Sequence, residues 1–246
     1  MISKSQTKYI QSLHHKKFRD EEQAFIAEGE KVVAELLQAD VFVCKQLTAL
    51  PEWLLANEKL IKKYAPAEVL EVKEYELEKI SALTTPNKVL AVFSKAKEPS
   101  VAVAGKITLV LDEIKDPGNL GTIIRIADWF GISSVVCSRN SADVYNPKVV
   151  QSTMGSLARV NVLYVDLHEW LNQHKKVKTY AATLNGTSIK NLKNIKEAIV
   201  IIGNESKGIS DEVMQFVNEK ITIPAVGHAE SLNAAVATGI ILSHIV

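Results

Sequence analysis

The spacing of apolar positions changes near residue 100. Before it, short β-rich runs alternate with stretches of helical period, which predicts a small α/β unit. The expected strands of this unit are 24–27, 41–44, 68–72 and 89–93, and its expected helices cover about 30–39, 51–64 and 74–83. A polar, charged stretch over 94–100, interrupted by Pro99, follows and is typical of an exposed linker.

Beyond the linker, several apolar runs become continuous, which indicates strands buried on both faces. The expected strands are 106–111, 134–137, 159–165, 178–182, 198–202 and 220–223, with helical segments between most of them. This pattern predicts a mainly parallel sheet covered by helices on both faces. We therefore expect an α/β chain of two domains, residues 1–98 and 105–246.

Composition supports a folded protein of one or two domains. Of 246 residues, 47% are apolar and 23% are charged, which excludes a disordered chain. No apolar run approaches the roughly 18 to 20 residues of a membrane span, and the first residues lack a secretory stretch, so we expect a cytoplasmic protein. Cys44 and Cys137 are the two cysteines, and His228 has no second histidine or cysteine at metal-binding spacing. We expect reduced thiols and no metal.

Charge is balanced overall but not locally. The chain has 29 basic and 28 acidic residues, so its net charge does not indicate a nucleic-acid partner. The first nineteen side chains nevertheless carry five basic residues and no acid: Lys4, Lys8, Lys16, Lys17 and Arg19. Such a run is either a solvated helix face or a surface that contacts phosphates, and charge alone leaves both open.

Three polar clusters follow strands of the expected sheet, at 112–119, 203–208 and 224–233. Ligands of parallel sheets bind at the carboxyl ends of strands, so these clusters are candidate site residues. In the first cluster, Asn119 is the expected N-cap of a helix over 120–130. Arg125 projects away from the apolar stripe of that helix, so it either faces solvent or recognises an anion.

The second cluster, GNESKG at 203–208, follows a strand and precedes a helix for which Ser210 is the expected cap. A phosphate-binding P-loop would need lysine where Ile209 stands, and Glu205 would repel phosphates. These residues argue against a nucleoside triphosphate site, a third alternative that binding of nucleotide with magnesium would reveal. In the third cluster, Ser231 can cap the last helix of the chain.

In order and in text, the three clusters resemble the signature motifs of the SpoU-type (TrmH-like) RNA 2′-O-ribose methyltransferases of the SPOUT superfamily. The matching stretches are DPGNLGTIIR at 116–125, GNESKG at 203–208, and 223–237 with its ESLNAAVA ending. The departures are Ala225, where methionine is common, and Ala234, where valine is frequent. The first hundred residues look like the substrate-binding domain of the same proteins, with FIAEG at 25–29 as the best anchor.

The resemblance implies a fold and a set of partners. The carboxyl-terminal sheet would carry a trefoil knot that binds S-adenosylmethionine, and the protein would be a homodimer with active sites near the subunit interface. The residues implied to line the methyl-donor pocket are Thr183, Leu184, Gly203, Ile223 and Leu232.

Catalytic roles follow from the same resemblance. Arg125 would lie near the ribose 2′-hydroxyl and its phosphate, where it assists deprotonation or stabilises the oxyanion. The residues that would orient Arg125 and the ribose are Asn119, Glu205, Ser231 and Asn233. The residues that would contact the RNA are Arg125 and the basic residues at the start of the chain, Lys4, Lys8, Lys16, Lys17 and Arg19.

The function expected from this resemblance is methyl transfer from S-adenosylmethionine to a ribose 2′-hydroxyl of structured RNA, with 23S ribosomal RNA preferred. Transfer RNA is the competing substrate. A non-catalytic RNA-binding protein of the same fold is the alternative of a different class.

Overall fold

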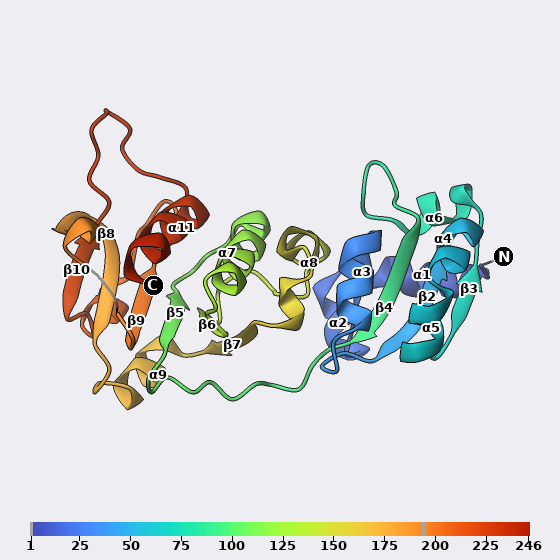
Figure 1. Ribbon diagram of the computed structural model, residues 1–246, viewed down its shortest axis with the longest axis horizontal. Coiled ribbons are helices and arrows are strands. Elements are labelled where there is room, and N and C mark those ends of the chain that lie inside the picture. The colour runs from blue at the N-terminus through green and yellow to red at the C-terminus, as the bar shows by residue number, and fades with distance from the viewer. Residues whose placement is uncertain (1, 193–194) are drawn as a thin grey trace. The chain divides into compact units, whose positions relative to one another are not determined.

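The computed structural model describes residues 2–192 and 195–246. By its internal contacts, the chain divides into two compact units. The first comprises Met1–Lys97 together with Asp143–Ala158, and the second comprises Glu98–Ala142 together with Arg159–Val246 (Figure 1). Residues 95–103, where the linker is expected, contain no helix or strand.

The first unit is built on a four-stranded sheet in the order β1-β4-β2-β3. Its strands are β1 (Ala24–Glu28), β2 (Cys44–Ala49), β3 (Val69–Glu71) and β4 (Val89–Ser94). Strand β4 runs antiparallel to β1 and β2, and β3 runs parallel to β2. The helices of this unit are α1 (Lys4–Ser12), α2 (Lys16–Glu21), α3 (Glu30–Leu37), α4 (Pro51–Ala56), α5 (Glu58–Tyr64), α6 (Glu74–Ile80), α8 (Pro147–Thr153) and the 3-10 turn η1 (Ser156–Ala158).

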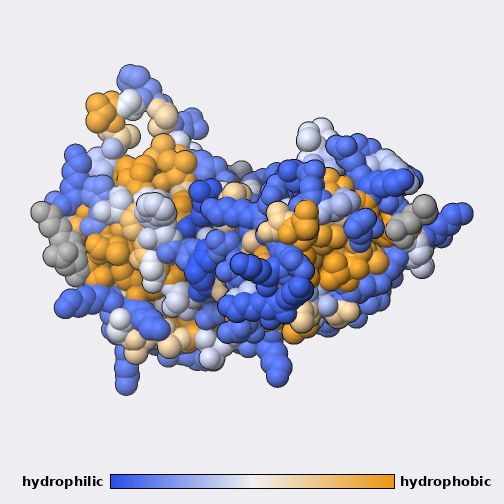
Figure 2. Space-filling model, turned by 45° about the vertical axis from the view of Figure 1, so that its right-hand side comes forward, coloured by the Kyte–Doolittle hydropathy of each residue, from blue (hydrophilic) through white to orange (hydrophobic). Residues whose placement is uncertain are grey.

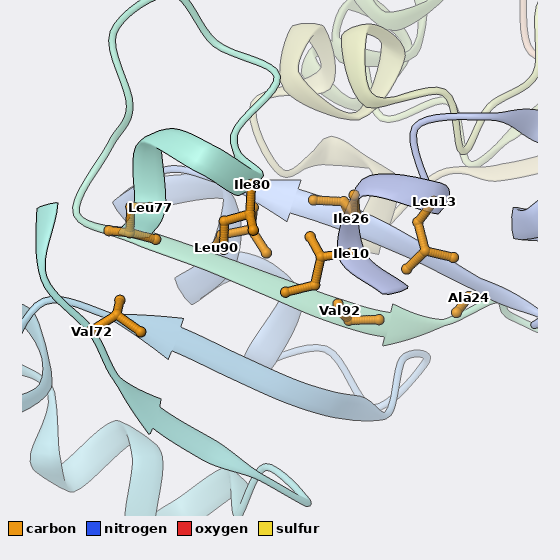
Figure 3. Packing of buried hydrophobic residues seen from close by; sticks show 9 residues of the cluster. All are labelled: Ile10, Leu13, Ala24, Ile26, Val72, Leu77, Ile80, Leu90 and Val92. Atoms are coloured by element: carbon orange, nitrogen blue, oxygen red, sulfur yellow. The ribbon is translucent and has the colours of Figure 1, made fainter. Parts of the chain in front are cut away.

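One apolar cluster joins helices α1 and α6 to this sheet. Figure 3 shows Ile10 of α1 pointing toward Val92 of β4. Ile10, Val92 and Ile80 at the end of α6 are fully buried. The basic first segment of the chain is therefore a helix anchored by an apolar face.

The second strand of this unit does not lie where its sequence predicts. Residues 41–43 of this apolar run form no strand. Val41 lies in a turn and is 53% exposed, and Val43 is 66% exposed. Strand β2 instead begins at Cys44 and contains Gln46 and Thr48, which are buried and hydrogen-bonded to each other at 3.1 Å. The expected strand was wrong because two internally paired polar residues hide the true one from a hydrophobicity pattern.

The second unit contains a six-stranded sheet in the order β10-β8-β9-β5-β6-β7, and all five strand pairs are parallel. The strands are β5 (Ile107–Leu111), β6 (Ser134–Ser138), β7 (Asn161–Val165), β8 (Thr179–Ser188), β9 (Ala198–Ile202) and β10 (Glu219–Thr222). Its helices are α7 (Pro117–Trp129), α9 (Leu167–Gln173), α10 (Asp211–Met214), α11 (Ala234–Ile245) and the 3-10 turn η2 (Ile189–Asn191). The predicted parallel α/β sheet is confirmed.

Helices cover both faces of this sheet. Val110 and Ile201 on one face pack with Trp170 of α9 and with Val213 of α10. Helices α7 and α11 lie side by side on the opposite side in Figure 1. The knot itself stays a prediction. In the described part of the chain, no helix has the length and apolar character needed to cross a membrane.

Candidate active site

The first motif forms the start of helix α7. Asp116 is the N-cap, because its side chain accepts a hydrogen bond of 2.8 Å from the Asn119 backbone N–H, and Pro117 occupies the first turn. The expected cap at Asn119 was therefore wrong by three residues. A proline at the first helical position and an aspartate before it are both favourable. Because Asp116 caps the helix, the amide side chain of Asn119 is left to bond elsewhere.

The second motif is a closed loop after strand β9. The backbones of Asn204 and Gly208 exchange two hydrogen bonds of 2.9 Å. The Asn204 side chain donates to the backbone carbonyl of Glu113 at 2.8 Å and accepts from the N–H groups of Ser206 and Lys207. This side chain therefore fixes the loop to the end of strand β5.

Hydrogen bonds between side chains join the three motifs. Asn119 Nδ2 donates to Glu205 Oε1 at 2.6 Å, and Asn233 Nδ2 donates to Asn119 Oδ1 at 2.8 Å. We call Asn119, Glu205 and Asn233 the motif triad. Asn233 Oδ1 accepts from the N–H groups of Ala235 and Val236, which makes Asn233 the N-cap of α11. The expected cap at Ser231 was wrong.

The side-chain amides of Asn119 and Asn233 in the motif triad can each adopt only one orientation. An ionised carboxylate accepts hydrogen bonds only, so the amide of Asn119 must turn its NH2 group toward Glu205. Its carbonyl oxygen then faces Asn233, whose own carbonyl oxygen faces the N–H groups of α11. Each amide orientation is thus set by its neighbours, and three segments far apart in sequence hold one geometry.

Arg125 and Ser231 lie outside this chain of hydrogen bonds. Both are exposed. Arg125 follows Asn119 by six residues on α7, which places it about 9 Å further along the helix and about 120° around it. Among the described residues, no hydrogen bond or ion pair involves the Arg125 side chain, so its guanidinium can meet an external anion.

The residues implied for the methyl donor follow three neighbouring strands. Thr183 and Leu184 lie in β8, Gly203 follows β9, and Ile223 follows β10. Leu232 belongs to the segment between β10 and α11. Because β10, β8 and β9 are parallel neighbours, their carboxyl ends meet at one edge of the sheet.

The pairing of β8 with β10 is interrupted at this edge. Lys220 pairs with Ala181, but the next residue, Ile221, pairs with Thr187. Residues 182–186 of β8 therefore form a wide bulge with no partner residue in β10. A hydrogen bond of 3.0 Å from Thr222 Oγ1 to the carbonyl of Leu184 holds this bulge.

Apolar side chains at this edge are open to solvent. Leu184 is 68% and Leu232 48% exposed, and Val226 in the same segment as Leu232 is fully exposed. The segment between β10 and α11 extends away from the sheet in Figures 1 and 2. Exposed apolar groups of this size are typical of a ligand site, and they fit the apolar and backbone wall expected for S-adenosylmethionine.

Gly203 is required by the shape of the second motif. A Cβ atom on Gly203 would lie 2.4 Å from the carbonyl carbon of Gly208 and 2.5 Å from the nitrogen of Ile209. No flexible side chain is involved that could move aside. The glycine therefore permits the loop to close on itself.

Two residues of the first cluster, Asp112 and Glu113, support the motifs through contacts that the sequence pattern did not predict. Asp112 is 4% exposed and accepts a hydrogen bond of 2.8 Å from the N–H of Ser210. Glu113 has a φ of 54°, and its carboxylate accepts from Asn140 and lies 3.3 Å from the ammonium of Lys115. Hydrogen bonds from Asn140 and Lys115 hold the pKa of Glu113 below its ordinary value. Their position at the end of a buried strand was the available signal.

The five basic residues at the start of the chain differ in their exposure. Lys4 and Lys8 lie on α1, and Lys16 and Lys17 on α2, and all four are exposed. Arg19 is only 1% exposed, and its guanidinium bonds to Asp143. Arg19 is therefore not available to a phosphate and leaves the expected RNA surface. Contact of the four lysines with RNA stays a prediction.

Both cysteines are free and buried. Burial raises the pKa of Cys44 to about 12, and it raises the pKa of Cys137 as well. In the part of the chain that the structure describes, no group of three histidine, cysteine, aspartate or glutamate side chains could hold a metal ion.

Comparisons with known proteins agree with this geometry. The SpoU rRNA Methylase family model matches residues 106–243, and the MRM3-like substrate binding domain model matches residues 4–91. The chain is 32% identical over 240 residues to the 23S rRNA (guanosine(2553)-2′-O)-methyltransferase RlmP of Bacillus subtilis, a match that covers 95% of this chain and 92% of that protein.

Two solved structures match almost the whole chain. One comes from Porphyromonas gingivalis and is assigned to the TrmH family of RNA methyltransferases; it has 41% identity, a TM-score of 0.88, and coverage of 99% of this chain and 98% of that one. The other is an AdoMet-bound rRNA methyltransferase from Sinorhizobium meliloti, with 29% identity, a TM-score of 0.88, and coverage of 99% and 95%. The chain therefore belongs to the SpoU rRNA methylase family, and it is an RNA 2′-O-ribose methyltransferase whose methyl donor is S-adenosylmethionine.

Proposed function

We propose that the protein methylates a ribose 2′-hydroxyl of 23S ribosomal RNA. The observation that carries the proposal is the motif triad, because it brings the three family motifs together at the carboxyl edge of the parallel sheet. The choice of RNA rests on the relative RlmP, which covers nearly the full length of this chain.

When bound, S-adenosylmethionine supplies an electrophilic methyl group. Residues of the carboxyl edge would hold the 2′-hydroxyl in line with that methyl group. On transfer, the hydroxyl proton would pass to solvent, and the sulfur would keep the electron pair of the bond that breaks. The exposed guanidinium of Arg125 is the group that we assign to the 2′-oxygen and the adjoining phosphate. A fixed positive charge there favours the developing alkoxide, and this kind of stabilisation is a large term in catalysis.

The remaining motif residues act by positioning. Asn119, Glu205 and Asn233 hold the starts of α7 and α11 against the second motif, which fixes the helix that carries Arg125. We place Ser231 at the ribose, because it is exposed two residues before the cap of α11. Thr183, Leu184, Gly203, Ile223 and Leu232 would hold the methyl donor.

The residues 1–98 would form the substrate-binding domain, and 105–246 the methyltransferase domain. The four exposed lysines of α1 and α2 fit contacts with RNA phosphates. Within the described residues, Lys17 alone of the four has an ion pair, at 3.9 Å from Glu21. Phosphate contacts of this kind give affinity without sequence selectivity.

We further propose a homodimer. Trp129 at the end of α7 is 85% exposed, and Val236 in the first turn of α11 is 50% exposed. A second copy could bury these side chains, and such apolar surface is expensive to leave in water. Sedimentation equilibrium tests this: a dimer is expected for the protein, and a shift toward monomer for Trp129→Lys. A monomer at micromolar concentration would contradict it.

The cytoplasm is the compartment that we propose, since the substrate is ribosomal RNA and both thiols are free. Cell fractionation with an antibody to the protein measures this directly. Recovery in the membrane or extracellular fraction would contradict it.

The function is tested by transfer of labelled methyl from S-adenosylmethionine to 23S RNA transcribed without modifications. Digestion to nucleosides then locates the label. A labelled 2′-O-methylnucleoside is expected. Label on a base would overturn the ribose assignment, and label on transfer RNA alone would change the substrate. Donor binding with no transfer to any RNA would favour the non-catalytic alternative.

A further inference from the structure

Segment Asp143–Ala158 belongs to one unit by sequence position and to the other by contact. It connects β6 to β7 of the parallel sheet, yet it packs with the first unit through α8 and η1. The chain therefore passes between the units three times: at Lys97–Glu98, at Ala142–Asp143 and at Ala158–Arg159. The contacts that hold each crossing point on the first unit therefore determine where the chain leaves that unit.

A buried ion pair fixes the second crossing point. Arg19 Nη2 and Nε donate to Asp143 Oδ2 at 2.7 and 3.1 Å, and Nη1 donates to the carbonyls of Leu13 and His14 at 3.0 and 2.9 Å. The two side chains are 2% and 14% exposed. Removing one partner would strand a buried charge, so the pair holds Asp143 firmly against α2.

Tyr145 ties the second crossing point to the first. Its hydroxyl oxygen accepts a hydrogen bond of 3.1 Å from the N–H of Ala96, one residue before the first crossing. Its ring lies 4.8 Å from the ring of Phe25, and the ammonium of Lys95 lies 5.3 Å from its centre. Burial raises the pKa of Tyr145, so the hydroxyl stays protonated at neutral pH.

On the other side of the second crossing, the backbone of Ala142 is hydrogen-bonded to the segment that precedes the first motif. The N–H of Ala142 donates to the carbonyl of Ile114 at 2.8 Å, and the Tyr164 hydroxyl donates to the carbonyl of Ala142. Ile114 precedes the helix cap Asp116 by two residues. The residue next to the ion pair in the chain is thus bonded to the segment that begins α7.

We propose that Arg19, Asp143 and Tyr145 form a junction clamp that positions bound RNA for methyl transfer. This inference rests on the proposed function. The clamp ties two of the three crossing points to the substrate-binding unit, so the chain that leads from this unit to the motifs starts from a fixed place. Its three members are positioning residues, because we assign none of them to the substrate or the donor.

Two variants test the clamp without removing its packing. Tyr145→Phe keeps the ring and loses only the bond to Ala96, and Asp143→Asn keeps the shape and loses the charge. The matched control is Glu52→Gln, which breaks an exposed ion pair of 2.9 Å with Lys88 in the same unit. The measurements are the dissociation constants for unmodified 23S RNA and S-adenosylmethionine, the single-turnover rate with both saturating, and the melting temperature.

We expect the single-turnover rate to fall about tenfold for Asp143→Asn and about threefold for Tyr145→Phe, since small misplacements of reacting groups are costly. Both dissociation constants should stay within about twofold, and Glu52→Gln should match the wild type. A rate per folded molecule that is unchanged well below the melting temperature would leave the residues a merely structural role and overturn the clamp.

A second readout separates the clamp from the chemistry. Spin labels at Lys59→Cys in the first unit and Lys175→Cys in the second report the distribution of distances between units. Loss of the clamp should broaden this distribution. If the wild type transfers no methyl, the proposed function fails while the distances still judge the clamp; an unchanged distribution in both variants overturns it.

Discussion

Polar side chains bridge distant parts of the chain in two regions, and the two regions are built differently. At the carboxyl edge of the parallel sheet, the motif triad consists of two amides and one carboxylate, and Glu205 is exposed. At the junction clamp, Arg19 and Asp143 are charged and almost fully buried. Exposed hydrogen bonds can exchange with water or substrate, whereas a buried ion pair cannot loosen without a large penalty. The edge can therefore adapt to ligands, and the clamp holds one arrangement.

The largest effect is expected from Arg125, which belongs to neither region. Arg125→Ala should lower the turnover number by about a thousandfold, because a charge at the reacting oxygen is lost. Donor affinity and melting temperature should change little, since the side chain has no bond to lose within the described chain. Calorimetric titration with S-adenosylmethionine checks the first and thermal unfolding the second.

Arg159→Ala is the matched control for that experiment. Arg159 is also an exposed arginine of the second unit, and it pairs with Asp128 at 2.8 Å. Its loss should leave turnover within about twofold of wild type. Equal losses in the two variants would show that Arg125 has no special role.

Asn119→Asp probes the edge directly and should lower turnover by about a hundredfold. The change places a second carboxylate at hydrogen-bond distance from Glu205, where two negative charges repel. Asn119→Ala should cost less than Asn119→Asp, because it removes the bond without adding a charge. Turnover at saturating donor and RNA measures both, and the reverse order would argue against repulsion between the two side chains.

Gly203→Ala tests whether the loop of the second motif tolerates any side chain. Overpacking of this kind destabilises proteins by about 1 to 3 kcal/mol, and we expect a loss in that range together with weaker donor binding. Gly227→Ala is the control, because a Cβ there would meet no atom within 4 Å. Urea unfolding measures the free energies, and equal stability of the two variants would contradict the close approach.

The smallest effect concerns acid stability in the first unit. Glu76 accepts from the N–H groups of Lys73 and Ile2, and the bond from Lys73 is the main reason that its pKa is lowered. A lowered pKa stabilises the folded state above the unfolded value of about 4.3 and loses this contribution as the pH falls through the folded pKa. Glu76→Gln should flatten the stability profile in that window and lower stability at pH 7. An unchanged acid-unfolding profile would contradict this assignment.

The sequence predicted the edge far better than the clamp. Continuous apolar runs predict the parallel strands, and the motif texts contain Asn119, Glu205 and Asn233, which the structure joins by hydrogen bonds. Two helix caps were misplaced, at Asn119 and at Ser231, because several neighbouring residues were chemically able to cap. In each case the geometry of the turn, which sequence does not display, selected the residue.

The clamp was hidden for a different reason. In the sequence, Arg19 is one of five cations in a basic run, and nothing in the local pattern distinguishes it from Lys16 or Lys17. Its partner Asp143 lies 124 positions away in the chain. Local periodicity carries no information about such a contact, which depends on how α8 returns to the first unit.

The interrupted pairing of β8 with β10 would reduce the conformational entropy that is lost when the proposed methyl donor binds. The residues on either side of 182–186 both pair with β10. The folded protein therefore holds the two ends of this segment together before a ligand binds. The entropy of closing such a loop is lost during folding and need not be lost again on binding. Gly186 tightens this further, since a Cβ there would lie 2.5 Å from the carbonyl oxygen of Lys220. On the proposed assignment of the methyl donor, this side of its site is already formed in the folded protein, and any ordering on binding would fall to the exposed segment between β10 and α11.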